Sequence, residues 1–370
     1  MIDLTYLAET VGDASASAVI GSAAGLVFGF LAQQSRFCTR SAIIEFTSGA
    51  PGKAAAVWFA ALGAAIAAVA LLIGFGGIAL DAVQLRTSPV GLSGAAIGGL
   101  LFGAGMILAR GCASRHLVLA ATGNLRAWVT FAVFSIVALA SISGPLAPLR
   151  RALTGLLAVH PSNADVLALA GLSASAGIAI GAAIIVAAVA LGLYRGKLAA
   201  VAAGLGVGLS IAAGWALTSA LAGLTFEPTQ VETLAFTAPS ANFAATIASA
   251  KAWSGDWLWT FDLGLIPGVF FGALLAGLIF RELEFQWFAS LLASVRYLAG
   301  AALMGLGGVS ALGCTIGSIG NAALMITSSW VALVAIWVGA AVTHRLVDAR
   351  SHHRSRGDRS VLPAGLPAAH

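Results

Sequence analysis

Long apolar stretches separated by short polar segments make up most of the chain. Nine of them reach or approach the roughly 20 residues that a helix needs to cross a bilayer. None shows the strict apolar–polar alternation of a half-buried β-strand. The pattern therefore predicts an all-α polytopic membrane protein with about nine transmembrane helices, near residues 15–35, 54–80, 91–109, 127–146, 166–193, 198–214, 262–280, 297–313 and 327–344.

Three shorter apolar segments follow the first, third and eighth stretches. Residues 39–46, 113–123 and 315–326 are too short to cross, and each returns the chain to the face from which it came. This predicts short re-entrant half-helices that dip into the bilayer. Irregular backbone at that depth persists only where protein or water covers it, so we expect these segments in the interior of the protein.

Composition agrees with this interpretation, because 59% of the 370 residues are hydrophobic and only 9% are charged. The first residues, MIDLTYLAETVGD, are acidic where a cleaved signal peptide would be basic, so no cleavable signal is expected. Three cysteines, an odd number, argue against a structural disulfide framework. Residues 347–370 are predicted to form a basic, disordered cytoplasmic tail.

Loop charges predict the orientation in the membrane. Positive charge accumulates in cytoplasmic loops, and most basic residues fall on one face if the N-terminus is outside and the C-terminus is cytoplasmic; Arg86, Arg150 and Arg151 are exceptions. With this orientation, residues 1–160 and 196–346 form two halves of inverted topology, joined by a transmembrane helix within 161–195. Inverted repeats are typical of transporters whose site lies near the middle of the membrane.

The three cysteines occupy one position of a repeated module. Each of Cys38, Cys112 and Cys314 follows a glycine by nine residues, and a small residue stands four positions before that glycine. The shared register predicts a single site where the thiols meet. The small-xxx-small spacing permits close helix crossings, and its pairs are Gly25/Gly29, Gly99/Gly103 and Ala301/Gly305.

A fourth copy of the module carries Ala202 and Gly206, but Trp215 stands in place of the cysteine. We expect the bulky indole to close one side of the site. The residue before each of three site positions is a glycine, which would free the backbone to leave the helix there. These glycines are Gly111, Gly214 and Gly313.

Thiols in one register favour a relay for a sulfur-containing anion. A thiol is a weak donor and a weak acceptor, so it can replace part of the hydration shell of a soft sulfur atom and still release the ion. Arg36, Arg110 and Arg115 are either cytoplasmic-side anchors or the source of a positive field for anions. Glu45 either pairs with Arg40, caps a helix or is functional.

Two other classes of function compete with this interpretation. Soft thiolates also suit copper(I) or zinc, which would make the protein a metal transporter. A cysteine could instead carry persulfide covalently in a membrane sulfur-transfer component, and Cys112 beside Arg110 is the best candidate. The sequence contains no P-loop, dinucleotide fingerprint or Ser/His/Asp arrangement, so we expect a transporter that is not an enzyme and needs no cofactor.

At these motifs the chain resembles the YeeE/YedE family of bacterial inner-membrane proteins. The matching segments are SRFCTRSA, GMILARGCASRHLVLAATGNLRAW and ALGCTIGSIGNA, with AAGWALTSA as the counterpart without cysteine. The resemblance implies import of thiosulfate through a narrow middle, with hydrogen bonds from Cys38, Cys112 and Cys314 in turn, and a small cytoplasmic TusA-like sulfur-carrier partner. Related members are associated with selenium metabolism. Arg40 departs from the small or apolar residue expected there.

Overall fold

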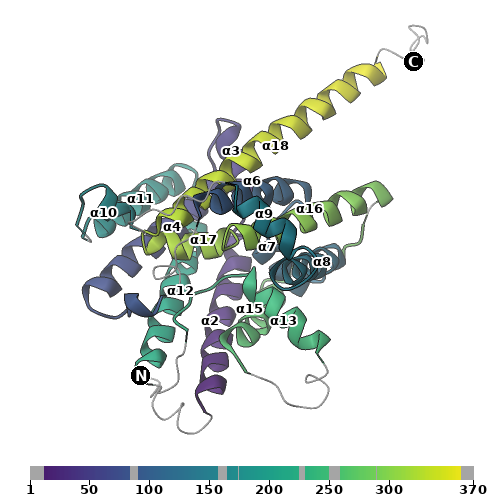
Figure 1. The fold of residues 1–370 in the computed structure, drawn as a ribbon. Helices are drawn as coiled ribbons and strands as arrows, with labels where there is room; N and C mark the ends of the chain where they lie inside the picture. Colours follow the sequence, from purple (N-terminus) through teal and green to yellow (C-terminus); the bar gives the residue numbers. More distant parts are fainter. Residues whose placement is uncertain are drawn as a thin grey trace.

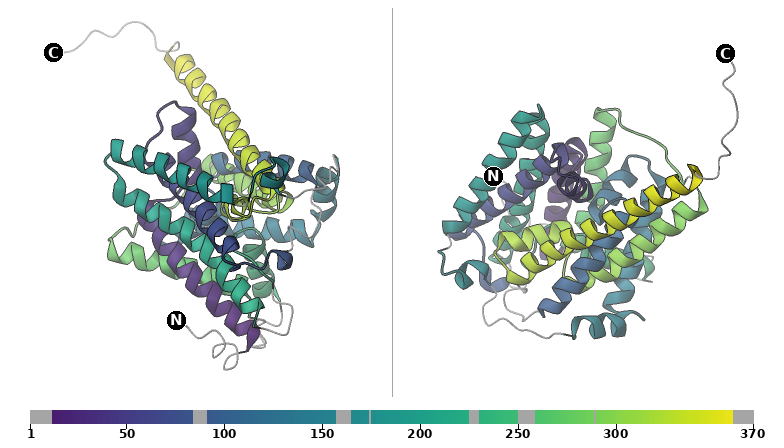
Figure 2. Two further views of the ribbon diagram at one scale, coloured as in Figure 1. Left: turned by 90° about the vertical axis from the view of Figure 1, so that its left-hand side faces the viewer. Right: turned by 90° about the horizontal axis from the view of Figure 1, so that it is seen from above.

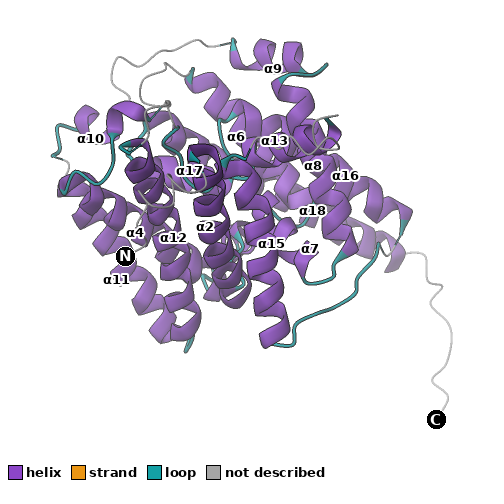
Figure 3. Cartoon of the chain, turned by 90° about the horizontal axis from the view of Figure 1, so that it is seen from below, coloured by secondary structure: helices purple, strands orange, loops and turns teal. Residues whose placement is uncertain are grey.

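The structure, a computed structural model, describes residues 12–83, 91–156, 165–173, 175–224, 230–249, 259–288 and 290–359. Within these ranges the chain forms helices and no strand (Figures 1 and 3), and nine helices are long and apolar enough to cross a membrane. The predicted all-α polytopic fold is therefore confirmed. The nine are α2 (Asp13–Ser35), α4 (Lys53–Gly74), α6 (Leu92–Leu108), α8 (Leu125–Ile142), α11 (Ser175–Tyr194), α12 (Leu198–Ala222), α15 (Phe261–Ile279), α16 (Leu291–Ser310) and α18 (Thr327–Arg359).

Short helices follow four of the long ones. Three were predicted as half-helices, and the structure places them at α3 (Thr39–Thr47), α7 (Ala113–Ala121) and α17 (Thr315–Ala323). The fourth, α13 (Ala238–Ala248), was not predicted and follows a segment without regular secondary structure at 230–235. Three further short elements lie in connections: η1 (Leu80–Ala82), α9 (Ala147–Thr154) and α10 (Val166–Leu169).

Several expected boundaries differ from the structure, and three of the differences change the picture. α12 continues through Gly214 to Ala222, because a glycine costs a helix interior only about 0.5–1 kcal/mol and does not by itself break it. The predicted helix over 166–193 is divided, since α10 is separate from α11. Helix α18 projects beyond the bundle as far as Arg359 (Figure 2), so residues 347–359 are helical where disorder was expected. Extending an existing helix costs far less than nucleating a new one. The rest of the tail lies outside the described residues.

The crossing of α2 and α15 is unusually close. A β-carbon on Gly25 would lie 2.6 Å from the carbonyl oxygen of Leu265, and one on Gly29 would overlap the carbonyl oxygen of Val269. Because the contacts advance in the same direction on both helices, α2 and α15 run parallel. Small residues let helix backbones approach in this way, as the module predicted.

Small residues also allow a close crossing of α6 and α18. In the fourth copy of the module, in α12, other glycines than the predicted ones make the close contact. A β-carbon on Gly99 would lie 2.7 Å from the carbonyl oxygen of Ala332 in α18. In α12 the residues against the α4 backbone are Gly204 and Gly208 rather than the predicted Ala202 and Gly206. The register of the fourth copy was therefore misassigned by two residues.

The long helices pack reciprocally. Helix α2 packs along α15 while α12 packs along α4, and in the same manner α6 packs along α18 while α16 packs along α8. The chain thus contains four units of long helix, short helix and long helix: α2–α3–α4, α6–α7–α8, α12–α13–α15 and α16–α17–α18. Each long helix named here packs on a long helix of the other half of the chain. This pattern is compatible with two related halves. Their inverted relation stays a prediction.

Glu45 has a local structural role. Its carboxylate accepts hydrogen bonds from the backbone nitrogens of Gly52 (3.0 Å), Ala54 (3.2 Å) and Ala55 (2.9 Å) at the start of α4. A carboxylate at a helix N-terminus satisfies otherwise unpaired donors and complements the helix dipole. Of the alternatives considered for Glu45, the structure supports the helix cap.

Candidate functional site

Each cysteine is the residue that immediately precedes a half-helix. Cys38 is the N-cap of α3, Cys112 of α7 and Cys314 of α17, all with extended backbone. None of the three side chains makes a capping hydrogen bond to its own helix. The backbone of Arg115 faces the Cys112 thiol, and the backbones of Ile316 and Gly317 face the Cys314 thiol, so these two thiols lie at the N-terminal ends of their half-helices, where the N–H groups favour anions.

The preceding helix ends in the same way at all three sites. Two residues before the cysteine the backbone is left-handed, with φ of 55° at Arg36, 60° at Arg110 and 59° at Leu312. The next residue then donates back into the helix, as Gly111 does to Met106 (3.1 Å) and Gly313 to Gly308 (2.9 Å). The break was expected at the glycines; it lies one residue earlier, on residues for which this conformation costs about 1–2 kcal/mol.

The thiols are buried and close to one another. Exposed fractions are 8% for Cys38, 0% for Cys112 and 1% for Cys314, and all three are free thiols. Cys112 interacts electrostatically with both of the other cysteines. Its sulfur lies 3.3 Å from the hydroxyl of Ser114. These electrostatic interactions agree with the single site that the common register predicts, and that site stays a prediction.

Hydroxyl groups without partners accompany the thiols. The side-chain oxygens of Thr39, Thr315 and Ser318 are buried and have no hydrogen-bond partner among the described residues. Thr39 and Thr315 directly follow Cys38 and Cys314. A buried hydroxyl without a partner costs about 1–3 kcal/mol by mutational measurements. The Thr315 hydroxyl also faces the Cys112 thiol, so it lies within the thiol region.

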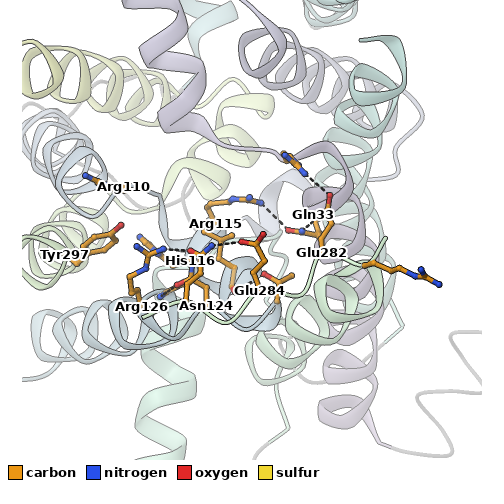
Figure 4. Close-up of a pocket in the computed structure, with 15 residues that line it drawn as sticks. Gln33, Arg110, Arg115, His116, Asn124, Arg126, Glu282, Glu284 and Tyr297 are labelled. Atoms are coloured by element: carbon orange, nitrogen blue, oxygen red, sulfur yellow. Dashed lines mark hydrogen bonds and ion pairs between the residues drawn. The ribbon is translucent and has the colours of Figure 1, made fainter. Parts of the chain in front are cut away.

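A cavity of about 450 Å³ lies beside this region and is rich in positive charge (Figure 4). Two of its lining side chains are carboxylates, Glu282 and Glu284. Arg36 binds Glu282 at 2.9 Å, and this hydrogen bond lowers the pKa of Glu282 below its ordinary value. Five lining residues are arginines: Arg36, Arg110, Arg115, Arg126 and Arg281. Positive charge exceeds negative charge in the lining, which favours anions.

Arg115 connects the cavity with the thiols. It lines the cavity and donates to Gln33 at 3.4 Å, and it interacts electrostatically with Cys38 and Cys112. Arg40 is a second charged neighbour of Cys38. Both arginines lie within membrane-spanning segments, where charged residues are rare and mark ion pathways.

His116 adds a buried imidazole to the wall of the cavity. Its exposed fraction is 3%, and neither ring nitrogen has a hydrogen-bond partner among the described residues. A β-carbon on Gly111 would lie 3.3 Å from its Nε2 atom. The glycine at 111 therefore makes room for the imidazole, and this is its observed role in place of the helix break that we expected.

Trp215 is not at a helix end. It lies within α12, is 2% exposed, and its indole nitrogen donates to the carbonyl oxygen of Gly320 in α17 at 3.1 Å. The residue thus packs against a half-helix of the site. However, Gly214 does not break the helix, so Trp215 is not the structural counterpart of the cysteines.

Sequence reasoning missed most of the cavity. Arg126, Arg281 and His116 lie at positions that follow no repeated motif, and Glu282 approaches Arg36 across a separation of 246 residues. The three arginines singled out in the sequence, Arg36, Arg110 and Arg115, all line the cavity. In the described part of the chain, no group of three or more His, Cys, Asp or Glu side chains is placed to hold a metal ion.

Comparison with known proteins gives one finding. The protein-family model described as Sulphur transport matches residues 34–342, which include all three cysteines and every residue that lines the arginine-rich cavity except Gln33. No curated protein matches the chain.

Proposed function

The chain belongs to the sulphur-transport family, and from this premise we propose that it imports thiosulfate or a related sulfur-containing anion through a narrow path lined by its cysteine thiols. The observation that carries the proposal is the repeated N-cap position of Cys38, Cys112 and Cys314 in one buried region.

This arrangement offers two kinds of contact to such an ion. The first-turn N–H groups and the free hydroxyls of Thr39 and Thr315 suit the oxygen atoms of a sulfur oxyanion. The thiols suit its terminal sulfur, because they are soft and bind weakly. Weak binding at several successive positions lets an ion enter and also leave.

The arginine-rich cavity supplies the charge that the thiols lack. A concave surface of one sign concentrates the opposite ion and raises its rate of encounter. We place this cavity at the cytoplasmic exit, with Cys38 nearest to it among the thiols, since Arg36 lines the cavity two residues before Cys38 and the lining residue Arg115 interacts electrostatically with Cys38. The N-terminus is then outside the inner membrane and the C-terminus inside. A cytoplasmic TusA-like sulfur carrier would receive the ion at this face.

Growth and uptake test the proposal together. A bacterial host without its own thiosulfate uptake, given thiosulfate as sole sulfur source, should grow only when it makes this protein. Thiosulfate radiolabelled at the outer sulfur should appear inside the cells as intact ion. Label that stays on the denatured protein would instead support the covalent sulfur-transfer alternative. Absence of both growth and uptake, with competition by selenium compounds or metal ions in binding assays, would contradict the proposal.

A further inference from the structure

The unpredicted helix α13 has the packing of a fourth half-helix. Half-helix α3 packs on α4 and α18, and α17 packs on the same two helices. Half-helix α7 packs on α8 and α15, and α13 also packs on those two. The four short helices therefore form two pairs with shared partners, and α13 completes the second pair.

The residue that precedes α13 corresponds to the cysteines. Thr237 is the N-cap of α13, as Cys38 is of α3, although its backbone is helical (φ −83°, ψ −63°) where that of Cys38 is extended. The local sequences also agree: Phe236, Thr237, Ser240 and Ala241 follow the spacing of Phe37, Cys38, Ser41 and Ala42. Both the helix packing and the local sequence thus point to Thr237 as the fourth site position.

The side chain of Thr237 is buried and free. It is 4% exposed, and its hydroxyl has no hydrogen-bond partner among the described residues. The neighbouring Ser240 hydroxyl, in contrast, donates to the carbonyl oxygen of Phe236 at 2.6 Å. An unpartnered buried hydroxyl is costly unless a ligand or water satisfies it.

Thr237 lies next to the Cys314 end of the thiol region. The backbone of Phe236 faces the Cys314 thiol, and a β-carbon on Gly308 would lie 2.9 Å from the Thr237 hydroxyl. Gly308 stands 11 residues after Tyr297 on α16, and Tyr297 lines the arginine-rich cavity. At 1.5 Å per residue this separation is roughly 16 Å along the helix, so Thr237 lies toward the opposite face.

We propose that Thr237 is the fourth contact position of the substrate path, at the end remote from the arginine-rich cavity, and that its hydroxyl binds an oxygen atom of the entering sulfur oxyanion. This rests on the proposed function. The order along the path is then Thr237, Cys314, Cys112 and Cys38. A hydroxyl is a harder donor than a thiol, so the first contact selects for the oxyanion part and the later ones for the soft sulfur.

Substitution at 237 provides the test. Thr237→Val keeps the shape and removes the hydroxyl, and Thr237→Ser keeps the hydroxyl. We expect the valine variant to raise the KM for thiosulfate uptake about tenfold and the serine variant to stay within about twofold of wild type. Thr246→Val is the matched control in the same helix, because the Thr246 hydroxyl is satisfied by the carbonyl oxygen of Asn242 at 2.9 Å. A valine variant with wild-type KM would overturn the proposal.

Chemical labelling adds a readout that does not depend on uptake. Thr237→Cys should react with a membrane-impermeant methanethiosulfonate applied from outside, and thiosulfate should slow the reaction while chloride should not. Failure to react, or reaction that thiosulfate does not slow, would place residue 237 off the path. The proposed function itself fails if Cys112→Ser and Cys314→Ser transport normally. If those variants are impaired while Thr237→Val is normal, only the present inference fails.

Discussion

The carbonyl oxygen of Ile336 in α18 occupies the place that a β-carbon on Gly103 in α6 would take, and the backbone nitrogen of Ala340 lies 2.7 Å from the same point. Two transmembrane helices therefore touch through their backbones at this glycine. The contact is between membrane-spanning segments, where close packing replaces the hydrophobic effect as the force between helices.

Gly103→Ala should therefore destabilise the protein, and Gly103→Leu or Gly305→Leu should prevent normal folding. Overpacking of a tight core costs about 1–3 kcal/mol, and more where backbone must move. The measurement is the apparent Tm and yield of monodisperse protein in detergent. Gly74→Ala is the control, since a β-carbon there meets nothing within 4 Å. Equal stability of Gly103→Ala and Gly74→Ala would refute the argument.

Cys112→Ser and Cys314→Ser should each lower thiosulfate uptake at least tenfold while the protein stays folded. Serine is nearly isosteric with cysteine, but its hydroxyl is a harder and more strongly hydrated donor. Cys38→Ser should have a milder effect, because Arg36 and Arg40 lie next to it in the sequence. Initial uptake rates and apparent Tm should be measured on the same preparations. Wild-type uptake in the triple serine variant would show that the thiols are only packing.

Arg115→Gln should reduce the uptake rate several-fold, and the deficit should shrink at high ionic strength, because added salt screens the field of the cavity. The uptake rate of Arg115→Lys should lie between the rates of wild type and Arg115→Gln. Arg195→Gln is a control for loss of charge, since Arg195 is exposed, does not line the cavity and donates to the Pro51 carbonyl oxygen (2.9 Å). An equal loss in both glutamine variants would exclude a specific role for Arg115.

Glu232 should make stability fall as pH rises. Burial, together with the neighbouring Asp262, raises the pKa of Glu232 from 4.5 to about 8. The folded protein thus binds this proton more tightly than the unfolded chain, so stability is greatest below pH 4.5 and is lost between about 4.5 and 8. The apparent Tm of Glu232→Gln should depend less on pH over that range than that of wild type. Asp81→Asn, at an exposed carboxyl, should leave the wild-type profile unchanged; parallel profiles for all three proteins would contradict the prediction.

Single cysteines at Gly49 and Leu156 should report opposite faces of the membrane. Both residues are exposed, and the loop charges place 49 in the cytoplasm and 156 outside. An impermeant maleimide added to intact cells should label Leu156→Cys and not Gly49→Cys, whereas both should react in permeabilised cells. The native thiols are buried and should give little background. Labelling of both positions from outside would overturn the predicted orientation.

Local physical chemistry explains what the sequence determined. Apolar length alone locates the nine long helices, because a bilayer requires about 20 apolar residues per crossing. The half-helices α3, α7 and α17 could also be predicted, since each short apolar run follows a break near Cys38, Cys112 or Cys314. The close crossings at Gly25 and Gly99 follow from the spacing of small residues, whichever helix is the partner.

Contacts between distant segments decided the rest. Which residue takes the left-handed turn depends on the hydrogen bonds that follow it, so Arg110 rather than Gly111 ends its helix. Trp215 matched the repeated spacing, yet α12 continues through it, and its indole donates to the carbonyl oxygen of Gly320 in α17, 105 residues away. The residue that we propose as the fourth site position is Thr237, the N-cap of α13. The location of α13 depends on its packing against α8 and α15. Sequence spacing determines which residues share one face of a helix. The tertiary structure determines which other helix that face contacts, because burial and hydrogen bonding act between groups that meet only in the folded chain.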